Sequence, residues 1–142
     1  MVSDNARPNS VQHAALCLWL SAGLGLLMTT AQVSGLVKTV GAAGPGLTAA
    51  IGLVTAGLLA LIAAKISVGR GWARWLFAAI YVIGSLGSVV LIFVALEVFR
   101  ALPTILQANT IAQFVLQTAA LVLVFTSTSR RWFNSTHADA AP

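Results

Sequence analysis

Long runs of apolar residues, separated by short polar or glycine-rich segments, are the dominant pattern along this chain. Each run is about 20 residues long, which is the length that a helix needs to cross the roughly 30 Å hydrocarbon layer of a bilayer. No stretch alternates apolar and polar positions as a strand of a membrane barrel does. We therefore expect four transmembrane helices, at residues 11–30, 47–66, 73–96 and 110–127.

The connections between these runs predict how the helices follow one another. Residues 41–46 are rich in glycine and separate the first two helices. Residues 67–72 form only a short loop, so the second and third helices are expected to be antiparallel neighbours. Pro103 is expected to open the fourth helix, because proline is tolerated in a first helical turn. The result is an antiparallel four-helix bundle with flexible tails at residues 1–10 and 134–142.

The composition indicates that lipid forms a large part of the surroundings of the chain. Of its 142 residues, 58% are hydrophobic and only 8% are charged, whereas a soluble domain carries about 25% charged residues. The net charge of +5 does not indicate nucleic-acid binding, because so apolar a chain offers no basic face on a soluble surface. The predicted fold class is all-α: a polytopic membrane protein with a single domain over residues 1–142.

The basic residues lie between the apolar runs and orient the chain. With both termini inside, six of the eight Lys and Arg residues fall on the inner side, and Lys38 and Arg100 fall outside. Basic residues accumulate on the cytoplasmic side of membrane proteins, so we expect an N-in/C-in protein of a bacterial inner membrane. Tryptophans flank the same boundary, at the depth of the lipid headgroups. The expected interface anchors are Arg70, Trp72, Arg74, Trp75, Arg130, Arg131 and Trp132.

The first apolar run has a second interpretation, as a cleavable signal peptide. Arg7 precedes the run and Thr29-Thr30-Ala31 follows it, in loose agreement with a cleavage site. Asp4 offsets the charge of Arg7, so we keep this run as a transmembrane helix. Gln32 as the amino terminus of the mature chain would contradict that assignment.

Small residues recur at every fourth position on the second helix. They form a stripe at Gly52, Ala56, Ala60 and Ala64. Helix association in lipid depends on close packing over such residues. The stripe is interpreted either as packing within the bundle or as the contact surface for a second copy or a partner helix. The same spacing joins Ser21, Gly25 and Thr29 on the first helix.

The fourth helix carries three amides at the same spacing, Asn109, Gln113 and Gln117. Amides at this depth are costly unless they bond a neighbour or line a wet cavity. One interpretation is interhelical hydrogen bonding, with each bond contributing on the order of 1 kcal/mol or less. The other is a polar vestibule that binds a substrate or a partner helix.

Catalytic and metal-binding patterns do not emerge from the sequence. Glu97 is the only acidic residue outside the tails, and the central parts of the other three helices hold no charge for proton coupling. His13 and His137 lack companions at metal-ligand spacing, and no serine lies in a nucleophile elbow. Cys17 has no cysteine to pair with. We expect no enzyme, no cofactor and no metal.

Two boundary segments resemble known proteins. Residues 69–74 (GRGWAR) and 129–133 (SRRWF) are similar to patterns in small bacterial four-helix membrane proteins that carry no established activity. The small multidrug-resistance transporters have a glutamate in their first helix, which this chain lacks. The quinone-linked thiol oxidoreductases need paired cysteines, and dual-topology fluoride channels have a weak charge bias. The resemblance implies the four-helix layout and transfers no reaction.

Three functional hypotheses follow. The leading one is an accessory, scaffold or assembly factor that acts through helix contacts in the lipid bilayer, with a membrane protein partner or as a homo-oligomer. The second is an immunity protein against a membrane-acting toxin. The third, from another class, is a small oligomeric transporter or channel lined by the amide stripe. None involves nucleic acid.

Overall fold

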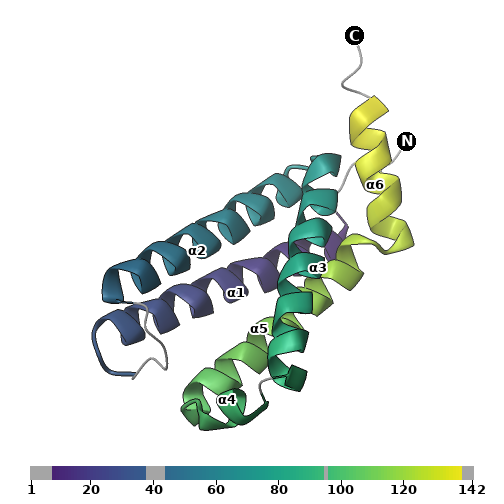
Figure 1. Ribbon diagram of the computed structural model, residues 1–142. Helices are drawn as coiled ribbons and strands as arrows, with labels where there is room; N and C mark the ends of the chain where they lie inside the picture. The colour runs from purple at the N-terminus through teal and green to yellow at the C-terminus, as the bar shows by residue number, and fades with distance from the viewer. Residues whose placement is uncertain (1–7, 38–43, 95, 139–142) are drawn as a thin grey trace.

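The computed structural model describes residues 8–37, 44–94 and 96–138, and all regular structure in these ranges is helical. The described residues form six helices, which Figure 1 labels in chain order. They are α1 (Asn9–Val33), α2 (Pro45–Ser67), α3 (Gly71–Val94), α4 (Leu96–Ala101), α5 (Thr104–Val124) and α6 (Ser127–Ala138).

Three of these helices, α1, α2 and α5, are long and apolar enough to cross a membrane. They overlap the first, second and fourth spans predicted above. α3 continues as a helix to Val94, and the apolar stretch that the structure describes in it is Gly71–Leu86. The structure therefore confirms an all-helical chain with helices suited to a membrane, and the third span stays a prediction.

α1 is the central helix of the molecule. It packs along both α2 and α5, whereas α3 starts beside α2, contacts α5 and leans away from the α1–α2 pair along its length (Figure 1). Tyr81 ties α3 to α5, with 2.6 Å between its hydroxyl and the hydroxyl of Thr118. The arrangement is thus a close α1–α2–α5 group with α3 laid against one end.

The hydrophobic core lies in the half of the molecule next to α6, which we call the proximal half. α1, α2, α3, α5 and α6 all contribute to it, and Phe77 of α3 and Phe133 of α6 are its largest fully buried side chains. In lipid such a core is held by close packing, since lipid tails are as apolar as the side chains. Its other fully buried members include Val11, Leu18, Ile62, Ile66 and Val124.

The C-terminal region differs from its prediction. α5 starts at Thr104 with Pro103 as its N-cap, in agreement with the expectation that Pro103 opens this helix, but it ends at Val124 and not at residue 127, and α6 follows. The helical run is interrupted at Thr126, whose hydroxyl caps the new helix, with 3.5 Å between the Ser129 amide and Thr126 Oγ1. The Ser129 hydroxyl, 2.9 Å from that of Ser10, joins α6 to the start of α1.

The segments predicted as flexible tails lie partly in these helices. Residues 9 and 10 belong to α1 and residues 134–138 belong to α6. Residues 1–7 and 139–142 lie outside the described part of the chain. The helix was not predicted over residues 134–138 because these residues are polar. It continues there from Phe133, which is buried.

The predicted interface anchors gather at the proximal end. Trp72 and Trp75 are exposed, and Trp75 also packs edge-on against Phe125. Arg74 differs from the others, because its guanidinium lies over the ring of Phe133, 5.3 Å from the ring centroid. Because of this contact, Arg74 helps hold α3 to α6. Its Nε and Nη1 atoms are buried with no hydrogen-bond partner among the described residues. Arg70, Arg130 and Arg131 are exposed and Trp132 is half-buried.

Candidate functional site

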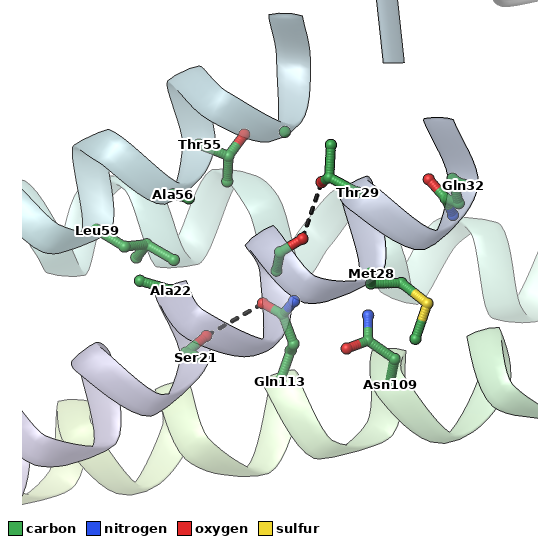
Figure 2. A pocket seen from close by; sticks show the side chains of 12 residues that line it. Ser21, Ala22, Met28, Thr29, Gln32, Thr55, Ala56, Leu59, Asn109 and Gln113 are labelled. Carbon is green, nitrogen blue, oxygen red and sulfur yellow. Dashed lines mark hydrogen bonds between the residues drawn. The ribbon is translucent and has the colours of Figure 1, made fainter. Parts of the chain in front are cut away.

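A cavity of about 190 Å³ lies between α1, α2 and α5 in the half of the molecule away from α6, which we call the distal half. Figure 2 shows Asn109 and Gln113 rising from α5 toward α1, with the side chains of α2 on the other side. None of its lining residues comes from the described part of α3. The lining residues are Ser21, Ala22, Gly25, Met28, Thr29, Gln32, Gly52, Thr55, Ala56, Leu59, Asn109 and Gln113.

The cavity is the distal continuation of the packed core. Ala22 and Leu59 belong both to the core and to the cavity wall. On the proximal side the three helices present bulky apolar residues, and Phe77 of α3 adds to them. On the distal side α1 and α2 present glycine, serine and threonine, and α3 has leaned away. The groove between α2 and α5 over α1 therefore stays partly empty there.

Ser21 and two of the predicted amides form one hydrogen-bonded group at the base of the cavity. The Ser21 hydroxyl is fully buried and donates to Gln113 Oε1 at 3.1 Å. Gln117 Nε2 donates to Ser21 Oγ at 3.1 Å and to Gln113 Oε1 at 3.3 Å. The group links α5 to α1, and within it Gln113 Oε1 accepts two hydrogen bonds.

Asn109 stands apart from this group. It lines the cavity one turn away from Gln113, and its Oδ1 atom is buried with no hydrogen-bond partner among the described residues. Gln113 Nε2 also makes no hydrogen bond within the described structure, and it lies beside Gly25. An unpaired buried polar atom costs about 1–3 kcal/mol, so this wall of the cavity holds unused hydrogen-bonding capacity.

The predicted stripe on α2 divides between two surroundings. Gly52 and Ala56 face α1 and line the cavity, and Ala60 and Ala64 are half-buried outside it. Gly52 lies directly against Thr29 of α1, because a Cβ placed on Gly52 would come within 2.8 Å of Thr29 Cβ. The stripe thus lets α1 and α2 approach closely beside the cavity, where Gly52 and Thr29 both lie in its lining.

Sequence analysis missed three polar side chains of the cavity wall. Thr29, Gln32 and Thr55 all line it, and Thr29 and Thr55 already donate to the carbonyls of Gly25 and Ile51. Their oxygens can still accept a hydrogen bond. The spacing of Ser21, Gly25 and Thr29 was the available signal, but it was interpreted as packing or as a contact surface for a second helix and not as a polar wall.

The cavity wall carries no charge. Its lining includes no Asp, Glu, Lys, Arg or His, and the described residues contain no cluster of three or more potential metal ligands. The hydroxyls have no general base beside them in the lining. What this wall can offer a ligand is therefore uncharged hydrogen bonding over an apolar floor.

We predict that Ser21 and Gln113 are energetically coupled. Ser21→Ala and Gln113→Leu should each lower the stability of the folded chain by about 1 kcal/mol, and the pair should show a coupling of about 0.6 kcal/mol. Equilibrium unfolding in mixed micelles gives these values. Thr30→Ala is the control partner, since the exposed Thr30 hydroxyl bonds only the carbonyl of Leu26 on its own helix. Equal coupling with Thr30→Ala would contradict the assignment.

Neither family models, nor curated proteins, nor solved structures match this chain. The features of the molecule that bear on function are therefore the cavity, its uncharged polar wall and the apolar helices around it.

Proposed function

We propose that this chain is a four-span protein of the bacterial inner membrane, an antiparallel bundle with both termini in the cytoplasm. The length of α3 supports its assignment as the third of the four spans, because its 24 residues extend about 36 Å at 1.5 Å per residue, and residues 76–94 carry no charge. The arginines and tryptophans at the proximal end support the orientation, since they suit a cytoplasmic headgroup region.

Reporter fusions test this orientation. A fluorescent protein that matures only in the cytoplasm should be bright at either terminus, because both ends lie beside the arginine-rich boundary. Alkaline phosphatase inserted next to Lys38 should be active, because the loop between the first two helices is expected outside. Termini that report from opposite sides of the membrane would refute the four-span topology.

We propose further that the chain acts by binding and not by catalysis, as an accessory or assembly factor for another membrane component. The observation that carries this proposal is the cavity, where polar side chains from three helices meet among apolar ones. Such groups are costly at membrane depth unless they have partners. A pore through a single chain receives no support, because the cavity ends against the buried core at Ala22 and Leu59.

A photo-reactive amino acid at Thr55 tests the accessory role in cells. Thr55 is exposed and lies on the cavity wall, so it should cross-link to one membrane protein in stoichiometric yield. Leu20 is the control, because it is 59% exposed on α1 and does not line the cavity. The same adducts from both positions, or none from Thr55, would overturn the partner proposal.

A further inference from the structure

The cavity wall presents hydrogen-bond donors and acceptors side by side. Gln113 Nε2 is an amide donor on the cavity wall beside Gly25, and Asn109 Oδ1, one helical turn away on α5, is a buried acceptor with no partner among the described residues. Across from them, Thr29 and Thr55 have given their protons to backbone carbonyls, which leaves their oxygens as acceptors. Both kinds of group therefore meet in one small space lined by three helices (Figure 2).

The size of the cavity suits a small molecule. An apolar protein cavity of about 150 Å³ is known to hold benzene, and this one measures about 190 Å³. The residues of its floor are closely packed, since Ser21, Ala22 and Ala56 are 0%, 3% and 4% exposed. A whole helix, about 10 Å in diameter, is too wide to enter it. A molecule of up to about ten non-hydrogen atoms fits these limits.

The chemistry of the wall selects among molecules of that size. A charged ligand would lose its hydration without meeting an opposite charge, because no ionisable side chain lines the cavity. A hydrocarbon would leave the amides of Asn109 and Gln113 unpaired. An uncharged molecule with hydroxyl or amide groups can both accept from Gln113 and donate to the threonine oxygens.

We propose that the distal cavity is a binding site for a small uncharged polar solute that carries hydroxyl or amide groups. Gly25 keeps the site open: a Cβ at this position would meet only Gln113 Nε2, at 3.4 Å, and a longer side chain would enter the cavity. The proposal rests on the binding role of the cavity and not on a protein partner. Loss of the Thr55 cross-link would leave it standing, and absence of solute binding would leave the partner contact standing.

Ligand-observed NMR on the full chain in lipid nanodiscs tests the proposal. The probes are urea, acetamide and glycerol, with acetate and guanidinium as charged controls of similar size. The uncharged probes should show saturable transfer at millimolar concentration, as expected for such small ligands, and the charged ones should show none. No saturable binding of any uncharged probe, or equal binding of the charged ones, would overturn the site.

Variants locate the signal. Gly25→Leu fills the cavity and should weaken binding of the uncharged probes by at least about tenfold, as should Gln113→Leu, which removes the donor. Gly57→Leu is the matched control on α2, because Gly57 does not line the cavity and a Cβ there meets nothing within 4 Å, and it should bind as the unmodified chain does. If Gly25→Leu fails to fold, Gln113→Leu alone decides. Binding that survives in a folded cavity variant places the solute elsewhere and refutes the assignment.

Discussion

Replacing Phe77 by alanine is expected to lower the free energy of unfolding by about 3 kcal/mol, near the lower end of the range for buried phenylalanines. Phe77 is 1% exposed and joins α3 to the proximal core. The membrane is the reason for taking the lower end of this range. An unpacked helix stays in lipid, where the apolar ring is still well solvated, but the close contacts around the ring are lost and a void remains.

Equilibrium unfolding in lipid–detergent bicelles measures this loss. Ile83→Ala is the control on the same helix, because Ile83 is 72% exposed, and a surface substitution of this kind changes stability by no more than about 0.5 kcal/mol. Equal losses for the two variants would mean that α3 does not pack on the core. Such a result would also remove the explanation for why the proximal groove is filled and the distal groove is hollow.

The sequence specifies the long helices well, because an apolar run of spanning length has few other folds open to it. α1 and α2 begin and end within three residues of their predicted bounds. The break at Thr126 was harder to find, since it depends on one hydroxyl capping α6. The lean of α3 is set by contacts such as Tyr81 with Thr118, which join residues far apart in the chain.

The candidate site divides in the same way. The four-residue spacing puts Gln113 and Gln117 on one face of α5, and the structure brings these two together with Ser21. Which helix supplies the partner depends on how α1 and α5 pack, and spacing along one helix carries no such information. Asn109 follows the same spacing and yet joins no partner. The cavity itself results from the way in which three helices pack together. The sequence of any one of these helices therefore does not predict it.

The close contact between Gly52 of α2 and Thr29 of α1 places the second large effect at Gly52. Gly52→Ala should lower the free energy of unfolding by about 2 kcal/mol, although alanine is the better helix former. The reason is steric: the new methyl group would overlap Thr29, whose Cγ2 lies 2.5 Å from the Cβ position. Gly57→Ala on the same helix is the control and should cost nothing, because open space surrounds that position.

A second substitution, on α1, tests whether steric overlap with Thr29 causes the loss of stability in Gly52→Ala. Thr29→Gly clears the space that the alanine at position 52 needs, so the Gly52→Ala/Thr29→Gly double variant should recover most of the loss caused by Gly52→Ala. Thr30→Gly, with its exposed side chain, should not rescue, although it adds the same helix-weakening glycine. Unfolding in bicelles distinguishes these outcomes by a positive interaction energy in the first pair alone. Additive losses in both pairs would show that Gly52 and Thr29 are not in contact. The packing of α1 against α2 beside the cavity would then be wrong.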